Sequence, residues 1–154
     1  MEGVRIENDS NLNKKSDTME VLLVEPGQYA RIVSIERSLE GMQHAVGGYI
    51  EAIYPYDDPI ALVCDEEGKL NGKELNRALR NEDGKIYDVV AGTFFVCGLG
   101  EESFDDLTKD LQDKYEKLFH QPEVFLQLSK GIMALKVEPE KQSGNKAKFK
   151  EMEL

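Results

Sequence analysis

The stretch of residues 39–54 most constrains the fold, because it carries a helix signal, a stop signal and a strand signal in direct succession. Apolar side chains recur at helical spacing in residues 39–46. Gly47 and Gly48 follow, and glycine enters the left-handed conformation of a helix C-cap without a steric penalty. Residues 49–54 are rich in β-branched and aromatic side chains, which favours a strand. The sequence therefore predicts a short helix that leads directly into a strand.

Further strands are predicted from apolar or alternating runs that are bounded by turn residues. Residues 21–24 and 30–35 flank a Pro-Gly turn, so we expect them to pair as a hairpin. Other strands are predicted at residues 60–63, 86–90 and 93–97. Residues 124–128 and 132–137 favour a last hairpin; a helix is the alternative there, and Gly131 weighs against it.

Two further helices are predicted after the first. Residues 70–79 are interpreted as a short helix with three leucines as its apolar contacts. The longest helix is predicted to begin near Ser103, an N-cap residue, and to end at His120-Gln121-Pro122. At about 100° per residue, its apolar side chains gather within one quadrant and its acidic side chains lie opposite them. The apolar stripe comprises Phe104, Leu107, Leu111, Tyr115 and Leu118.

These elements predict an α+β fold with a mainly antiparallel sheet, on which one short and one long amphipathic helix pack. At 154 residues the chain is expected to form a single domain. We place that domain at residues 19–137, between a flexible polar lead-in of residues 1–18 and a mobile polar tail of residues 138–154.

The chain carries a formal net charge of −11 at pH 7. This charge repels phosphate backbones and anionic lipids, so we expect neither direct nucleic-acid binding nor membrane binding. It suits a basic protein partner, or solubility alone. The N-terminus lacks the apolar segment of a signal peptide, and no apolar run is long enough to span a bilayer. The sequence therefore predicts a cytoplasmic protein.

Cys64 and Cys97 each follow apolar strand residues and lack a partner at C-x-x-C spacing. This pattern predicts two small buried side chains in a reducing compartment, with a disulfide between them as the alternative.

Motifs for catalysis, metal binding and phosphate binding are weak in this sequence. Gly98 and Gly100 lack the third glycine of a dinucleotide-binding loop, and two glutamates follow where an anion would approach. Residues 65–68 do not place oxygen ligands at the spacing of a calcium loop. His44 and His120 have no His or Cys partner at metal-binding spacing. We therefore predict no catalytic residue, no metal site, no cofactor and no enzymatic activity.

One group of candidate binding residues is polar. Asn71, Asn76 and Arg77 stand out in a mostly acidic sequence, and they predict a possible ligand-binding site. The alternative for Arg77 is a local contact with Asp83 or Asp88.

A second group combines aromatic and acidic residues. Tyr54 and Tyr56 adjoin Asp57 and Asp58, and this composition suits a protein contact surface. The alternative is that the two tyrosines cover the edge of the sheet.

Five segments between residues 19 and 119 carry a resemblance to a known family. They are Val24-Glu25-Pro26-Gly27, Val46-Gly47-Gly48-Tyr49-Ile50-Glu51, Asp65-Glu66-Glu67-Gly68-Lys69-Leu70-Asn71-Gly72, Leu75-Asn76-Arg77-Ala78-Leu79 and Ala91-Gly92-Thr93-Phe94-Phe95-Val96. In this order they resemble an uncharacterised family, a domain of unknown function of bacteriophages and conjugative elements of Gram-positive gut bacteria. The resemblance implies no catalytic residues. It implies a cargo protein of mobile elements, with some relatives similar to antirestriction and anti-CRISPR proteins.

Charge and resemblance together predict an acidic mobile-element protein that binds and modulates or inhibits a host protein. A nucleic-acid-handling defence enzyme is the expected type of partner, because its basic groove attracts carboxylates. Electrostatic attraction would raise the association rate more than the affinity, and salt would weaken binding. The acidic contact surface is expected to comprise Asp105, Asp106, Asp110, Asp113 and Glu116.

The alternative function is a small-molecule or nucleotide-binding module. Its pocket would lie between the sheet and the short helix and would be lined by Tyr54, Asn76 and Arg77. The oligomeric state does not follow from the sequence.

Overall fold

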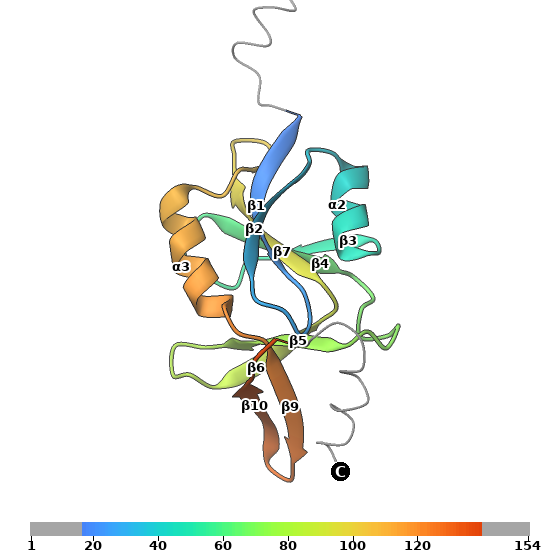
Figure 1. Cartoon of the computed structure of the whole chain (residues 1–154), viewed down its shortest axis with the longest axis vertical. Coiled ribbons are helices and arrows are strands. Elements are labelled where there is room, and N and C mark those ends of the chain that lie inside the picture. The colour runs from blue at the N-terminus through green and yellow to red at the C-terminus, as the bar shows by residue number, and fades with distance from the viewer. Residues whose placement is uncertain (1–16, 140–154) are drawn as a thin grey trace, which may run out of the picture.

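A computed structural model of the chain describes residues 17–139, whose architecture is mainly β (Figure 1). Ten strands form three antiparallel sheets in this part of the chain, together with two short helices. The predicted α+β fold with a long helix is therefore wrong, since the two helices have only eight and eleven residues. Apart from Asp17 and Thr18, the predicted lead-in lies outside the described residues, as does the predicted tail beyond residue 139.

The largest sheet has the strand order β2-β1-β7-β4-β3, with the short strand β8 paired to β7. Its strands are β1 (Thr18–Val24), β2 (Arg31–Glu36), β3 (Ile50–Ile53), β4 (Ile60–Asp65), β7 (Phe94–Leu99) and β8 (Phe104–Asp105). Strands β1, β7 and β4 occupy the centre, and apolar side chains on both of their faces are buried. This explains why their sequences are nearly continuous apolar runs. The hairpin predicted from residues 21–24 and 30–35 is confirmed as β1–β2.

Two layers of core lie on opposite faces of this sheet, because successive side chains of a strand alternate between its faces. Phe94 belongs to the cluster that contacts helix α3 (Lys109–Phe119), and Phe95 belongs to the cluster that contacts helix α2 (Leu39–Val46). The two helices accordingly lie on opposite sides of the sheet (Figure 1).

Helix α2 is confirmed with the bounds that the sequence predicts. The Ser38 hydroxyl accepts a hydrogen bond from the Gly41 N–H at 2.9 Å, which caps the N-terminus. Gly47 has a φ of 77° and ends the helix in the left-handed conformation. Local signals therefore set the two ends of this helix, while its packing against the sheet through Val46 and Met42 stabilises it.

The short helix predicted for residues 70–79 is wrong, because residues 75–80 form a strand. Strands β5 (Leu75–Arg80) and β6 (Ile86–Ala91) pair as a separate two-stranded sheet. Leu70 precedes this sheet in a turn and is 85% exposed, so the leucines do not share an apolar face. Leu79 is buried, whereas Leu75 lies exposed near the start of the strand. Four consecutive residues of this strand, 76–79, are buried, so both of its faces are covered and the expected helical stripe does not exist.

The predicted long helix is also wrong, because residues 103–108 are not helical. Phe104 and Asp105 form β8 against the end of β7, and α3 begins only after Thr108. Gly98 permits this return of the chain, since a Cβ at that position would lie 2.3 Å from the backbone oxygen of Asp106. Strand pairing therefore takes precedence over the helical periodicity of the sequence.

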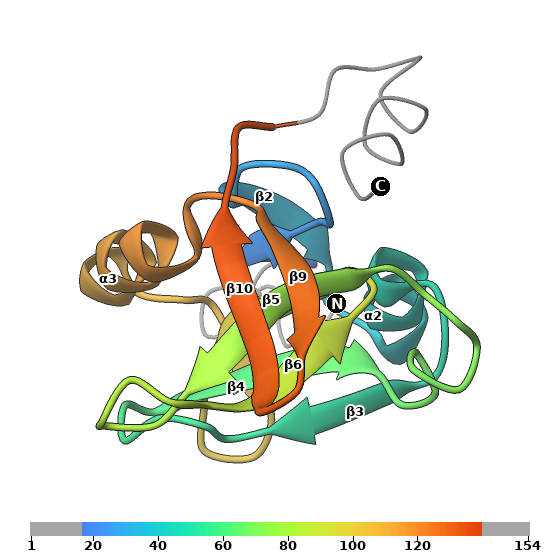
Figure 2. The ribbon, with the colours of Figure 1, turned by 90° about the horizontal axis from the view of Figure 1, so that it is seen from below.

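The predicted last hairpin is confirmed, and its helical alternative is wrong. Strands β9 (Glu123–Leu128) and β10 (Gly131–Lys136) pair with each other along their whole length. Figure 1 shows this hairpin extending from the β5–β6 sheet, away from the largest sheet. Figure 2 shows the hairpin crossing the β5–β6 sheet. Among the described residues neither strand pairs with any other strand.

Asn76 and Arg77 are enclosed where the sheets and α3 meet, with exposures of 0% and 1%. The Arg77 guanidinium donates hydrogen bonds to the carbonyls of Phe119 at 3.0 Å and Gln28 at 2.6 Å. It also donates to the Asn76 side-chain oxygen at 2.9 Å. Burial lowers the pKa of Arg77 to about 10, so the guanidinium stays protonated at neutral pH.

The Asn76 side chain extends this network to two more segments. Its amide nitrogen donates to the carbonyls of Val24 at 2.9 Å and Gly92 at 2.8 Å. Together the two side chains join β5 to the end of β1, the β1–β2 turn, the β6–β7 connection and the end of α3.

We predict that Arg77→Met lowers the free energy of unfolding by about 2–4 kcal/mol, because it leaves buried carbonyls without donors. Urea unfolding followed by circular dichroism measures the change. Arg31→Met is the matched control, since Arg31 forms an exposed ion pair with Glu25 and its loss is expected to cost less than about 1 kcal/mol. Equal effects of the two substitutions would contradict this account.

Candidate functional site

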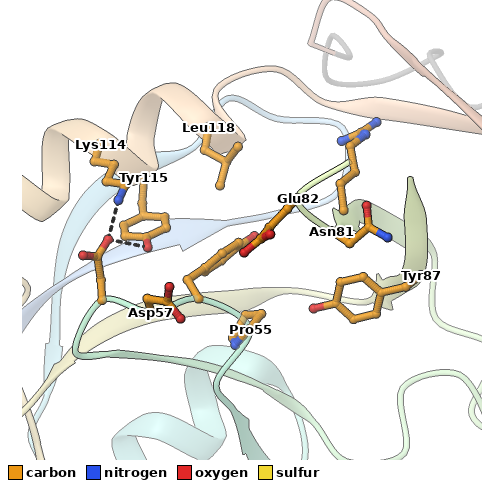
Figure 3. Close-up of a pocket in the computed structure, with 11 residues that line it drawn as sticks. Pro55, Asp57, Asn81, Glu82, Tyr87, Lys114, Tyr115 and Leu118 are labelled. Atoms are coloured by element: carbon orange, nitrogen blue, oxygen red, sulfur yellow. Dashed lines mark hydrogen bonds and ion pairs between the residues drawn. The ribbon is translucent and has the colours of Figure 1, made fainter. Parts of the chain in front are cut away.

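A cleft of about 550 Å³ opens between three segments that are distant in the sequence (Figure 3). The β3–β4 loop, the β5–β6 turn and α3 form its walls, and we call it the tyrosine cleft. Its lining residues are Pro55, Tyr56, Asp57, Asp58, Arg80, Asn81, Glu82, Tyr87, Lys114, Tyr115 and Leu118. This volume lies within the range that is typical of small-molecule sites.

One end of the tyrosine cleft is fixed by Asp58. Its carboxylate accepts hydrogen bonds from the Lys114 ammonium at 2.6 Å and from the Tyr115 hydroxyl at 2.8 Å (Figure 3). Lys114 and Tyr115 together hold the pKa of Asp58 below its usual value. Burial raises the pKa of Tyr115, and its hydrogen bond to Asp58 raises it further. The loop is thus joined to α3.

The other end is fixed by a buried carboxylate. Glu123, the first residue of β9, accepts hydrogen bonds from the Ala78 N–H at 2.8 Å and from Arg80 at 3.3 Å. Arg80 therefore enters the cleft with its charge already paired. Tyr56 lies between the two ends, with its ring centroid 5.2 Å from that of Tyr115, and burial raises the pKa of its hydroxyl.

Two carboxylates of the cleft have no partner in the part of the chain that the structure describes. Asp57 and Glu82 are exposed, and within residues 17–139 neither has a hydrogen bond or an ion pair from its side chain. Tyr87, which is 55% exposed, lies at the same end as Asn81 (Figure 3). The lining of the cleft therefore combines tyrosine rings with carboxylates that have no cationic partner within the described residues.

The β9–β10 hairpin carries the second notable surface. Directly paired residues place their side chains on the same face, as Leu126 does with Met133 and Val124 with Leu135. We call the resulting surface the apolar hairpin face. It comprises Val124, Leu126, Leu128, Met133 and Leu135. The last four of these side chains are between 41% and 45% exposed, and contiguous apolar surface of this kind marks interaction sites.

The predicted ligand-binding residues do not share one surface. Asn71 is exposed in a turn, whereas Asn76 and Arg77 are enclosed and bind backbone carbonyls. Arg77 makes these contacts instead of the local alternatives with Asp83 or Asp88. The predicted pocket lined by these residues and Tyr54 is thus not assembled.

The acidic residues predicted to share one helix face are divided between two elements. Asp105 and Asp106 precede α3, and both pair with Arg37, at 3.4 and 3.5 Å. On α3, the other three differ in their contacts. Asp113 lies 3.6 Å from Lys109, Glu116 lies 2.6 Å from His120, and Asp110 is exposed in the first turn.

The second predicted group is largely brought together. Tyr56, Asp57 and Asp58 line the tyrosine cleft, whereas Tyr54 is 60% exposed outside its lining. The tyrosines thus differ in role, since Tyr56 packs against Tyr115.

Sequence reasoning missed Glu82, Tyr87 and Lys114 as parts of one site. They belong to β5–β6 and α3, and only the tertiary fold brings them to the β3–β4 loop. It also missed the exposure of the apolar hairpin face. The alternation of apolar residues at 124, 126 and 128 carried that signal, but alternation does not show whether a layer covers the apolar face.

No group of three or more His, Cys, Asp or Glu side chains within residues 17–139 is arranged to hold a metal ion. Cys64 and Cys97 are buried free thiols, as predicted. Burial raises the pKa of Cys64 to about 11 and that of Cys97 to about 12, so both are protonated at neutral pH.

Comparison with known proteins gives one match. The family model described as Domain of unknown function (DUF3846) matches residues 19–120. The matched range contains the tyrosine cleft and ends before the β9–β10 hairpin. No curated protein and no solved structure matches the chain. Within the described residues, no helix has both the length and the apolar character that crossing a bilayer requires.

We predict a pH-dependent effect of Asp58→Asn on stability. The pKa of Asp58 is lowered in the folded state, so its contribution is present above the unfolded-state value of 3.8 and is lost as the pH falls below that value. The difference in free energy of unfolding between wild type and variant should therefore be constant above about pH 5 and shrink toward pH 3. Urea titrations across this range measure it, and a difference that grows on acidification would refute the assignment.

We also predict that iodoacetamide leaves both cysteines of the folded protein unmodified at pH 8, because the thiols are buried and protonated. After unfolding in guanidinium chloride, both should react within minutes. Mass spectrometry counts the modified thiols, and glutathione in the same solution controls for reagent activity. Rapid modification of the native protein would show that these strands open readily.

Proposed function

The chain belongs to the family described as Domain of unknown function (DUF3846), and we propose that it acts by binding another protein through the apolar hairpin face. In this proposal it is an acidic accessory protein of a mobile element that acts in the cytoplasm. Its partner is a host protein, such as a nucleic-acid-handling defence enzyme, that it modulates or inhibits. The family assignment supplies no activity, so the proposal depends on the surface of this chain.

The exposure of the apolar hairpin face is the observation that carries the proposal. A two-stranded hairpin is marginally stable in water unless another layer covers its apolar side chains. Here Leu126 and Met133 form a cross-strand pair, and each is 41% exposed. A partner that covers the face would bury these side chains and gain the corresponding hydrophobic free energy.

The charge of the chain narrows the class of partner. A net charge of −11 disfavours association with a second copy, with nucleic acid and with anionic lipid. It favours a protein whose surface is basic around an apolar groove. In this proposal the exposed carboxylates of Asp110 and of Asp113, which lies beside Lys109, contribute to the attraction.

The test compares capture from host-cell lysate by wild type, by Leu126→Ser/Met133→Ser and by the control Leu70→Ser. Leu70 is 85% exposed in a turn that lies outside the hairpin. A captured protein is identified by mass spectrometry and purified, and its affinity for each variant is then measured. It should bind wild type and the control with equal affinity. We expect its affinity for the double variant to fall at least about tenfold, since central apolar contacts dominate interface energies. Raising the salt concentration should weaken binding to wild type.

Two outcomes would overturn the proposal. One is a partner that binds the double variant as tightly as wild type while circular dichroism shows both folded. The other is a wild-type dimer in sedimentation that the double variant abolishes, because the hairpin would then be covered by a second copy.

A further inference from the structure

The tyrosine cleft contains two cations, and both are already neutralised. The Lys114 ammonium lies 2.6 Å from the Asp58 carboxylate, and Arg80 lies 3.3 Å from Glu123. Neither cation therefore needs an anionic ligand to balance its charge. The chain as a whole also repels anions, because its net charge is −11.

The two other carboxylates of the cleft, in contrast, lack a cation within residues 17–139 to balance their charge. Asp57 and Glu82 line the cleft without a charged partner in the described part of the chain. They come from the β3–β4 loop and the β5–β6 turn, so they face the cleft from different walls (Figure 3). A cation between them would interact favourably with both.

The aromatic lining suits the same kind of ligand. The face of a tyrosine ring attracts guanidinium and alkylammonium cations electrostatically, and a guanidinium gives up its water at lower cost because it is more weakly hydrated than an ammonium group. This cleft already contains one such contact, with the Lys114 nitrogen 5.5 Å from the Tyr115 ring centroid. Tyr56 and Tyr87 lie in the lining beyond that contact, and Tyr87 is 55% exposed.

We propose that the tyrosine cleft binds an organic cation, a guanidinium or alkylammonium group, against Tyr56 and Tyr87 with Asp57 and Glu82 as counter-charges. The cation is supplied either by a free amine or by an arginine or lysine side chain of a protein. The second source fits the basic partner proposed above, but binding in the cleft does not require the apolar hairpin face.

The test is a titration of the full chain followed by backbone amide chemical shifts in NMR. The probes are arginine with its amino group acetylated and its carboxyl group amidated, spermidine, and inorganic phosphate. The arginine derivative should shift the amides of Asp57, Glu82 and Tyr87, and phosphate should shift none of them. Tyr87→Ala and Glu82→Gln should each raise the dissociation constant of the arginine derivative about two- to fivefold.

Matched controls distinguish binding in the cleft from nonspecific attraction of cations to an acidic protein. Tyr49→Ala removes a tyrosine that is 70% exposed, and Glu101→Gln removes an exposed carboxylate; neither residue lines the cleft. Both variants should bind the arginine derivative as wild type does. Equal loss in controls and cleft variants would overturn the proposal, as would binding of phosphate at Arg80 and Lys114 in place of the cations.

A second arm identifies the source of the cation. If Tyr87→Ala weakens binding of the purified partner, a partner side chain occupies the cleft. If the partner binds unchanged while spermidine shifts the cleft amides, a free amine does, and either result supports the proposal. The small probes act on the isolated chain, so failure of the cleft to bind them is distinct from failure of the hairpin to bind a partner.

Discussion

A guanidinium enclosed in the interior is the interaction on which the rest of this structure depends. A buried charge is costly unless its donors find acceptors, and Arg77 finds them in the carbonyls of Phe119, Gln28 and the Asn76 side chain. These contacts hold β5 against the end of α3 and the β1–β2 turn. Because the tyrosine cleft opens between the β5–β6 turn and α3, its walls are positioned by the same contacts.

The acidic side chains of the chain are distributed over several elements and do not form one charged helix face. Several carboxylates are committed to internal contacts: Asp65 pairs with Lys73, Glu123 with Arg80 and Asp58 with Lys114. Asp106 contacts Arg37 and also accepts a hydrogen bond from the Glu20 N–H. The net negative charge is therefore spread over the surface. A charge spread in this way acts over a long range, and in the proposals made above the selective contacts lie at the hairpin and the cleft.

The sequence predicted the elements whose ends are determined by local interactions such as helix caps and turns. The first helix is set by a Ser38 cap and by Gly47, and the hairpins follow from turn residues between apolar runs. The errors arose where strand pairing outweighed helical periodicity, at residues 70–79 and 103–108. The candidate site was predicted only in part, because only some of its residues are neighbours in the sequence. Tyr56, Asp57 and Asp58 adjoin in sequence, whereas Tyr87 reaches them only through the packing of β5–β6.

The base of the hairpin and the end of the cleft share one buried carboxylate. Glu123 opens β9, and its two oxygens bind the Ala78 N–H of β5 and the guanidinium of Arg80. The orientation of the hairpin and the position of Arg80 are therefore fixed by the same side chain. A displacement of β9 would strain or break the contact between Glu123 and Arg80, and Arg80 is one of the two cations that line the cleft. The hairpin lies outside the matched family domain, but it is joined to a site that lies inside it.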